Sequence, residues 1–443
     1  MKNKPETTIV CFGAGPAYKG GMSDYNTSLA RALSGFEAVK VHMVSWSQQY
    51  PGIVPREFKD KVSTLDFLKD TGIPCKYITN YNNPFSWAAT AKYIASLQPD
   101  KVIIQWSIAI QGLPIGSIVK KLKKLSNCEI IMDLHFVGQK EKSSLDKKLT
   151  KMGLRHAGTY IVHALKTWEE LRELFPERQF VITRSGERNA DINHGAIPVI
   201  KLFHPVYELY RPDPDFDVQT FKKEHGLKQY VFLFFGFIRK YKGLHHALKA
   251  FEQVAAQRDD VSFLICGELF WNTLAPGSII TRLKKGVFAL AKRLLLKTSD
   301  DERNYNPLAL IDELRVQGCT KVISEFIPNE EVHKYFQAAD ASVLFYSRAT
   351  PSGIESLSYN FNVPVLTTHT GHFPETIQSG KNGYITPANT VEAMAETMLH
   401  FLENPIPQEN VARYKTKLSW KAYAAAILND EKNKTFHHVK QTA

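Results

Sequence analysis

Glycines follow the first hydrophobic segment of the chain and precede a segment with helical periodicity. Gly13 and Gly15 come directly after the apolar residues, and Gly20 and Gly21 stand just before the helical segment. Glycine lets the backbone approach a ligand closely, and the unpaired N–H groups of a helix N-terminus attract an anion. The spacing matches neither a P-loop nor a dinucleotide fingerprint. These residues therefore indicate either an anion-binding turn or a structural turn between a strand and a helix.

A second glycine-containing turn carries positive charge. A buried strand is expected to end at Gly236, and Arg239, Lys240 and Lys242 follow in the loop before a helix that begins at Gly243. Two or three cations beside a helix N-terminus suit a diphosphate, and they would stabilise the negative charge that grows on a departing phosphate. The alternative is a solvated basic loop without a ligand.

A third turn, in the sequence ATPSGI, also precedes a helix. Thr350, Ser352 and Gly353 offer hydroxyl and N–H groups that make a second anion-binding nest. The alternative is that Ser352 only caps the helix. Capping alone does not explain why two turns suited to phosphate occur in one half of the chain.

The segments between these turns alternate between short β-rich apolar runs and longer runs of helical period. This order is typical of stacked βαβ units with parallel sheets, and a Pro- and Asp-rich stretch at 204–218 interrupts it. We therefore predict an α/β protein with two Rossmann-like domains facing across a cleft, residues 1–206 and 207–403, and a helical segment, 404–443, that packs back on the first domain. The expected strands are Thr8–Phe12, Val39–Ser45, Lys101–Gln105, Glu129–Leu134, Tyr160–His163, Val199–Leu202, Val231–Phe235, Ser262–Cys266, Lys321–Ser324, Ala341–Phe345 and Val363–Leu366.

The composition narrows the class of protein. The 443 residues are 44% apolar and 23% charged, which excludes disordered, collagenous and small disulfide-rich proteins. The longest apolar stretch, about 230–238, is shorter than the roughly 20 residues of a membrane span, and the first residues lack a signal-peptide core. The five cysteines are scattered along the chain, and we interpret them as reduced. We therefore expect a cytoplasmic protein. The formal net charge of +12 favours polyanions, anionic lipids or phosphorylated small molecules.

The motifs occur in an order found in a known family. From about Thr8 to Pro387 the chain resembles the retaining glycosyltransferases of family 4, which have the GT-B fold and hold a nucleotide sugar mainly in the C-terminal domain. By this resemblance, residues 1–206 would form the acceptor side and residues 207–403 the donor side. The resemblance rests on the segments PAYKGGMSDYNTSLARAL, DLHFVGQ, FHPVY, FGFIRKYKGL, LICGE, FIPNEEV, FQAADASVLFY, ATPSGI and VPVLTTHTGHFPETIQSGKNGYI.

The resemblance also implies roles for single residues. His135 would contact the transferred sugar, whereas a histidine at the end of an apolar strand is otherwise often structural. Arg239 and Lys242 would bind the diphosphate and complete the catalytic set. The implied donor-binding residues are Gly20, Gly21, Gly236, Glu268, Thr350, Ser352, Gly353, Ile354 and Glu355.

One position departs from the family's pattern. The family's two glutamates, with seven residues between them, would fall at Ala349 and Leu357, and neither residue is acidic. The sequence is similar instead to the subgroup with a Thr-x-Ser-Gly-Ile/Val turn. Glu355 lies two positions from the second site and is a candidate to contact the ribose in its place.

No metal and no cofactor are expected besides the donor, a nucleotide-diphosphate sugar. Asp213, Asp215 and Asp217 resemble the D-x-D motif of the other major glycosyltransferase fold, but they lie in a proline-rich stretch and we interpret them as solvated. The sequence contains no H-E-x-x-H motif and no Cys/His ligand set.

Two basic segments bear on the acceptor. Residues 278–297 combine six cations with an apolar helical face, which suits an anionic membrane surface or a helix packed on the second domain. Residues 140–156 follow His135, where the acceptor is expected to enter. Together they favour a lipid-linked or otherwise anionic acceptor over a free sugar, and a peripheral position on the inner face of the cell membrane. Nucleic-acid-binding modules are missing from the sequence, so we expect no nucleic-acid partner.

These observations predict a metal-independent retaining glycosyltransferase. It would move a hexosyl unit from a nucleotide-diphosphate sugar to a glycan or lipid-linked acceptor in cell-surface polysaccharide or glycolipid synthesis. A sugar-nucleotide epimerase or hydrolase on the same fold is one alternative, and it would need carboxylates in the cleft, for which the candidates are Glu141, Glu268, Glu355 and Glu375. A non-catalytic protein that binds polyanions is the other.

Overall fold

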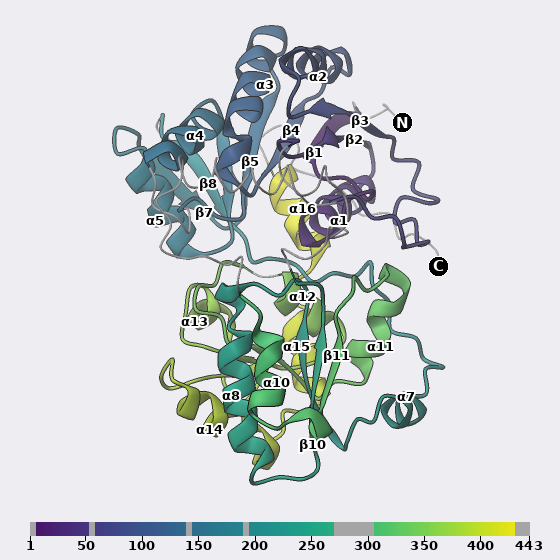
Figure 1. Ribbon diagram of the computed structural model, residues 1–443. Helices are drawn as coiled ribbons and strands as arrows, with labels where there is room; N and C mark the ends of the chain where they lie inside the picture. Colours follow the sequence, from purple (N-terminus) through teal and green to yellow (C-terminus); the bar gives the residue numbers. More distant parts are fainter. Residues whose placement is uncertain are drawn as a thin grey trace.

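The protein folds into two α/β domains, each built on its own parallel sheet. Figure 1 shows the computed structural model, with the first domain above the second and helices around both sheets. This arrangement confirms the predicted fold class. The structure describes residues 6–52, 58–138, 144–188, 195–269, 305–351 and 353–429. Several sequence predictions fall outside these ranges, namely the ones on Ser352, on the basic segment 278–297, on residues 140–143 and on residues 430–443.

The described part of the first domain has an eight-stranded parallel sheet in the order β3-β2-β1-β4-β5-β6-β8-β7. Side chains alternate between its faces: Ile9 and Cys11 pack towards α1 and α16, whereas Val10 and Phe12 pack towards α2 and α3. Both faces are therefore buried, as a parallel sheet requires. The elements are β1 (Thr7–Gly13), α1 (Gly21–Ser34), β2 (Val39–Gln48), β3 (Cys75–Asn80), α2 (Pro84–Ser96), β4 (Lys101–Trp106), α3 (Gly112–Leu125), β5 (Glu129–Leu134), α4 (Ser144–Leu154), β6 (Thr159–Val162), α5 (Leu165–Leu174), β7 (Phe180–Thr183) and β8 (Ile197–Lys201).

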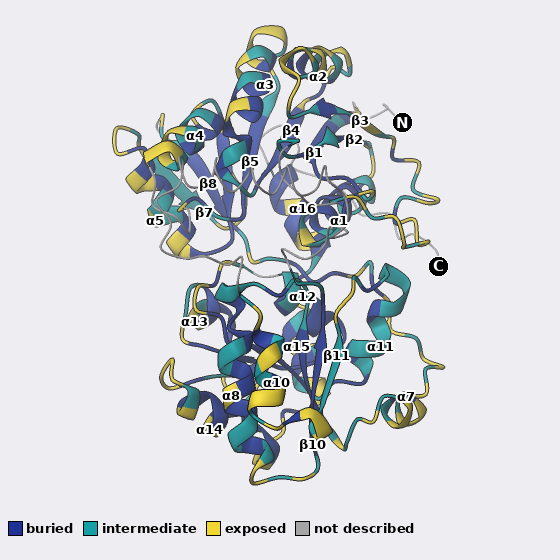
Figure 2. Cartoon of the chain, in the orientation of Figure 1, coloured by how far each residue is buried: buried dark blue, intermediate teal, exposed yellow. Residues whose placement is uncertain are grey.

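The second domain repeats this plan with a six-stranded sheet, within the described residues, in the order β11-β10-β9-β12-β13-β14. Phe232 and Phe234 of β9 pack towards α8 and α14, while Val231 and Leu233 face the side that holds α11 and α12. Figure 2 shows this buried centre with exposed residues at its rim. The elements are α7 (Val218–Glu224), β9 (Tyr230–Phe235), α8 (Leu244–Ala255), β10 (Val261–Cys266), α10 (Leu310–Glu313), β11 (Thr320–Ile323), α11 (Val332–Gln337), β12 (Ala341–Leu344), α12 (Gly353–Asn360), β13 (Val365–Thr367), α13 (Phe373–Thr376), β14 (Gly383–Ile385) and α14 (Val391–Glu403).

Three of the described strands were not predicted from the sequence, and all three lie at the edges of their sheets. β3 and β7 are the outer strands of the first sheet, and β14 is an outer strand of the second. The residues of β7 are all half-buried, and β14 has only three residues. An edge strand is less buried than a central one, so its sequence carries a weaker run of apolar residues.

Two C-terminal helices connect the domains. α15 (Gln408–Lys415) lies beside α12 of the second domain, and α16 (Trp420–Leu428) lies against α1 of the first. The Trp420 indole donates to the Val206 carbonyl over 2.6 Å, and the hydroxyls of Tyr423 and Tyr25 are 2.6 Å apart. None of the described helices combines the length and the apolar character needed to cross a bilayer.

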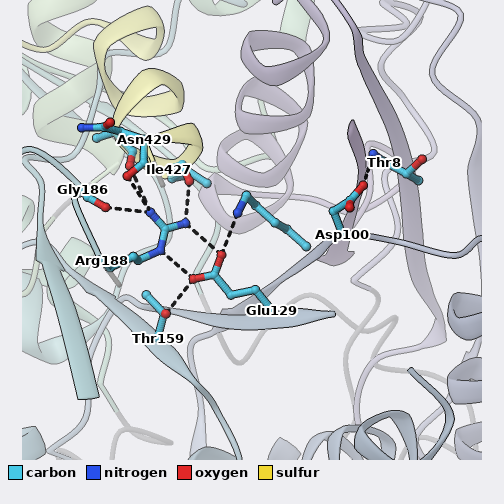
Figure 3. Close-up of polar contacts among 10 residues, drawn as sticks. Thr8, Asp100, Glu129, Thr159, Gly186, Arg188, Ile427 and Asn429 are labelled. Atoms are coloured by element: carbon cyan, nitrogen blue, oxygen red, sulfur yellow. Dashed lines mark hydrogen bonds and ion pairs between the residues drawn. The ribbon is translucent and has the colours of Figure 1, made fainter. Parts of the chain in front are cut away.

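A buried arginine fastens the end of α16 to the first domain. In Figure 3, Arg188 donates to the Ile427 carbonyl over 2.6 Å and to both carboxylate oxygens of Glu129 over 2.6 and 2.9 Å. Burial alone would raise the pKa of Glu129, but the hydrogen bonds and charges of Arg188 and Lys101 lower it to about 2. The carboxylate therefore stays ionised at neutral pH, and this network holds α16 in place.

Candidate active site

A cavity of about 270 Å³ lies between the two domains, at the carboxyl ends of strands from both sheets. β1 leads to it from the first domain, and β9 and β10 lead to it from the second. In open α/β sheets this edge is the usual place for a ligand. The sequence-predicted residues that line it are Gly20, Gly21, Gly236, Lys242, Glu268, Thr350, Gly353 and Ile354.

Two helices begin at this cavity, and one tyrosine lies between their first residues. α1 starts at Gly21 and α12 at Gly353, and the Tyr207 hydroxyl donates to the Gly21 carbonyl over 2.8 Å. A Cβ added at Gly353 would lie 2.9 Å from the same hydroxyl oxygen, so a larger residue would displace the tyrosine. Both helix N-termini thus present backbone N–H groups and partial positive charge to one cavity.

The cavity also contains a buried lysine. Lys242 ends the short 3-10 helix η2 (Lys240–Lys242), and only 8% of it is exposed. Its ammonium is close to the backbone of Gly236, because a Cβ at that glycine would lie 3.0 Å from Nζ. Burial, followed by the neighbouring charge of Arg239, lowers the pKa of Lys242 to about 7. A diphosphate in the cavity would supply the negative charge that this lysine lacks.

Gly243 follows Lys242 directly and fixes the backbone at that point. We expect replacement of Gly243 to destabilise the protein. Its φ is +68°, and a Cβ there would lie 2.0 Å from the Phe345 carbonyl oxygen. We expect Gly243→Ala to lower the free energy of unfolding by about 2–4 kcal/mol, because backbone strain and a backbone clash add together. Urea denaturation measures this change.

Gly226 provides the matched control for that experiment. It also has a positive φ, +64°, but nothing lies within 4 Å of a Cβ added there. Gly226→Ala should therefore cost only the strain of the backbone, about 1 kcal/mol. Equal losses in the two variants would contradict the assigned clash.

Carboxylates at the cavity were largely missed by sequence reasoning. Asp24 and Glu325 line it besides Glu268, which also forms an ion pair with Lys19 of the first domain over 3.5 Å. Burial raises the pKa of Asp24 to about 7, although a hydrogen bond from Tyr210 partly offsets the rise. Asp24 stands in the segment GGMSDYN, and only its place in the first turn of α1 could have drawn attention to it.

His135 lies outside the residues that line this cavity. Its ring packs edge-on against Tyr25 of α1, with the centroids 4.6 Å apart, and its Nε2 is 2.9 Å from the Gln105 side-chain oxygen. The Gln105 amide nitrogen is 3.5 Å from the Asp133 carboxylate. Because the Gln105 oxygen accepts a hydrogen bond, the Nε2 proton is fixed and Nδ1 carries the lone pair. Burial lowers the pKa of His135 to about 3, so the ring is neutral.

Glu355 forms a hydrogen bond with a histidine of the same domain. Its Oε2 is 2.5 Å from Nε2 of His372, and both side chains are buried. These two residues border a small cavity that Tyr359 and Tyr414 also line, and neither of them lines the cavity around Lys242. Arg239 likewise does not line the larger cavity; its guanidinium lies 5.6 Å from the centroid of the Tyr241 ring.

Within the described ranges, Asp133, His135 and His163 have ligand atoms within 4.8 Å of one another, as a metal site would. The Asp133 carboxylate already accepts hydrogen bonds from His163 over 2.9 Å and from Tyr423 over 3.2 Å. Both of its oxygens therefore already have partners within the protein. We interpret the cluster as a buried network that supports His135.

Comparisons with known proteins agree with this fold. Residues 215–418 match the family model described as glycosyl transferases group 1. Similar solved structures include Anabaena HepE in complex with UDP and glucose (13% identity, 95% of each chain, TM-score 0.60) and sucrose-phosphate synthase from Thermosynechococcus elongatus (13%, 95% of this chain and 96% of that one, 0.60). Another is the lipopolysaccharide outer core galactosyltransferase WaaB (14%, 95% and 99%, 0.54).

No curated protein shows significant sequence similarity to the chain. At such low identities the structural likeness shows the fold, and the family match covers just under half of the chain. The second domain is therefore similar to glycosyl transferases group 1 over residues 215–418, and the chain has the two Rossmann-like domains of the GT-B fold.

Proposed function

We propose that the protein is a retaining glycosyltransferase that moves a hexosyl unit from a nucleotide-diphosphate sugar to a glycan or lipid-linked acceptor. The observation that carries this proposal is the cavity between the domains, where Lys242 and the first residues of α1 and α12 meet. One buried cation and two helix N-termini suit a diphosphate better than a neutral ligand. The match to a glycosyltransferase domain and the UDP and glucose bound by HepE support the same reading.

In this proposal the protein acts mainly by electrostatic stabilisation and positioning. Lys242, assisted by the charge of Arg239, would stabilise the leaving diphosphate as the bond to the sugar breaks. The turns at Gly20–Gly21 and Thr350–Gly353 would donate backbone N–H groups to the phosphates. Transfer would take place on the front face of the sugar, with the leaving phosphate removing the proton of the acceptor hydroxyl. His135 would contact the transferred sugar through the Nδ1 lone pair.

The acceptor and the cellular location are also part of the proposal. We propose synthesis of a cell-surface polysaccharide or glycolipid, with the enzyme in the cytoplasm and on the inner face of the cell membrane. The basic residues of 140–156 support contact with an anionic surface, and Lys147, Lys148 and Lys151 of α4 belong to this segment.

The carboxylates at the cavity favour a second candidate, a sugar-nucleotide epimerase or hydrolase. Asp24, Glu268 and Glu325 all line the space around Lys242, and a general base there would act on water or on the sugar ring. The reaction products distinguish the candidates. An acceptor-dependent glycoside indicates transfer, whereas free sugar or an epimer formed without an acceptor indicates the alternative.

A direct test incubates the protein with UDP-, GDP-, ADP- and dTDP-hexoses and with a panel of acceptors. We expect release of one nucleoside diphosphate to depend on an acceptor, and NMR of the product should show the anomeric configuration of the donor retained. An inverted product would refute retention. The absence of turnover with every donor would refute the proposed function.

Metal independence follows if Lys242, Arg239 and the helix N-termini neutralise the diphosphate. We expect EDTA to leave the rate of nucleotide release within about twofold of the untreated enzyme, because the protein supplies the charge that a divalent ion would otherwise supply. Coupled assays with and without EDTA measure this. A loss of activity that magnesium or manganese restores would contradict the proposal.

A further inference from the structure

A groove of about 810 Å³ adjoins the cavity around Lys242 and is larger than it. The first domain contributes α4, α5 and the loop at 137–138, and the second contributes residues 348–351 and His372. Thr350 and Pro351 border both the groove and the cavity. A molecule in the groove would therefore reach the turn that covers the donor.

Two buried polar atoms on residues that line the groove have no hydrogen-bond partner among the described residues. They are the Thr150 hydroxyl oxygen and Nδ1 of His372, and these side chains are only 1% and 2% exposed. An unsatisfied buried polar group destabilises a protein unless a ligand or water supplies the missing bond. A hydroxyl group can satisfy either atom, since it both donates and accepts.

The charges around the groove indicate which kind of ligand could supply hydroxyl groups to these two atoms. α5 contributes Glu169, Glu170 and Glu173, and Glu170 also accepts a hydrogen bond from the Gly138 N–H over 2.7 Å. Figure 2 shows exposed residues along α4 and α5. Among the described residues, the charged groups that line the groove are the acids Asp146, Glu169, Glu170 and Glu173 and the cations Lys147, Lys166 and Arg348.

This balance disfavours an anionic ligand. Carboxylates accept hydrogen bonds from the hydroxyls of a sugar, whereas they repel a phosphate or a uronate. The basic segment 140–156 suggested an anionic acceptor from the sequence alone. Of the described lysines in that segment, only Lys147 lines the groove.

We infer that this groove binds the acceptor and that the acceptor residues inside it are uncharged, hydroxyl-rich sugars rather than phosphorylated or uronic sugars. The inference rests on the proposed transferase function, and it adds the chemical class of the acceptor. Glu169 and Glu173 are the specificity-determining residues, because they are exposed, lie one helical turn apart and line the groove.

The test measures binding directly, so that it does not depend on turnover. Neutral trisaccharides of glucose, galactose and mannose, and the matching trisaccharides that end in a uronic acid, are titrated against the full-length protein by saturation-transfer NMR. We expect at least one neutral trisaccharide to bind at least fivefold more tightly than its uronic counterpart. The double variant Glu169→Gln/Glu173→Gln should weaken neutral binding at least fivefold.

Two further variants make the result specific to the groove. Glu177→Gln removes a carboxylate just after α5 that does not line the groove, and it should change no affinity. Glu169→Lys/Glu173→Lys should reverse the preference towards the uronic sugars.

Several outcomes would overturn the inference: no binding of any neutral trisaccharide, tighter binding of the uronic sugars by the wild type, or equal effects of Glu177→Gln and the double variant. Slow hydrolysis of the nucleotide sugar reports on the donor site separately. If hydrolysis persists while the trisaccharides fail to bind, the groove inference fails and the proposed function stands. If trisaccharides bind but no donor is turned over, the proposed function fails instead.

Discussion

Replacing Lys242 with methionine is expected to lower the turnover number by about 100-fold or more. The ammonium is buried beside Gly236, in the same cavity as the first residues of α1 and α12. In our proposal it faces the leaving diphosphate, and loss of one such buried donor typically costs about 100-fold in rate. Methionine keeps the length and the apolar stem of the side chain. Steady-state assays with the preferred nucleotide sugar measure the effect.

The same variant should be more stable than the wild type, which separates function from folding. Burial lowers the pKa of Lys242 to about 7, below its value in the unfolded chain, so the charged form destabilises the folded state. This penalty is fully present below pH 7 and falls as the pH rises towards 10. We expect Lys242→Met to raise the free energy of unfolding by about 1–3 kcal/mol at pH 6 and by less at pH 9.

Lys249→Met is the matched control, because Lys249 is exposed on α8 and lies outside the cavity. It should leave both turnover and stability nearly unchanged. Turnover of Lys242→Met close to that of the wild type would refute the role of Lys242. A large loss of stability in that variant would instead assign Lys242 to the structure.

The affinity for a nucleotide sugar should fall as the pH rises from 6 to 8, by about 10- to 100-fold. Two groups at the cavity titrate in this interval and act in the same direction. The pKa of Asp24 is raised to about 7, so this residue gains a negative charge, and the pKa of Lys242 is lowered to about 7, so that residue loses a positive one. Each change disfavours the diphosphate by up to about tenfold for each pH unit above the pKa. Isothermal titration calorimetry with UDP-, GDP- and ADP-glucose measures this, since their doubly esterified diphosphates keep their charge.

Asp24→Asn tests the carboxylate's share of that dependence. The variant should bind more tightly at pH 8 and show about half of the logarithmic decline, and the double variant Asp24→Asn/Lys242→Met should show almost none. The raised pKa of Asp24 also means that ionisation destabilises the folded wild type as the pH rises from about 4 to 7. Asp24→Asn should therefore match the wild type at pH 4 and be more stable at pH 8. A wild-type affinity that does not change between pH 6 and 8 would exclude both assignments.

The alternation of strands and helices, the glycine turns and the cations after β9 were all readable from the sequence, because each depends on residues close together in the chain. Buried strands such as β4 and β9 are recognisable from their continuous apolar runs. The turns that the glycines predicted have positive φ angles at Gly20, Gly236 and Gly243. The edge strands lacked such runs and were missed.

Only the tertiary structure decided which of these local features meet. Asp24 and Lys242 come from different domains, and their shared cavity depends on how the two sheets lie across the linker. Tyr207 belongs to the segment FHPVY, which contributed to the family resemblance, but no function could be assigned to this tyrosine from the sequence. It lies beside Gly21 and Gly353 only after both domains have folded. The direction of Glu355, towards His372, was also hidden, because a side chain on a short helix points wherever the packing of its neighbours allows. Long-range packing, which no local pattern encodes, therefore determined the composition of the candidate site.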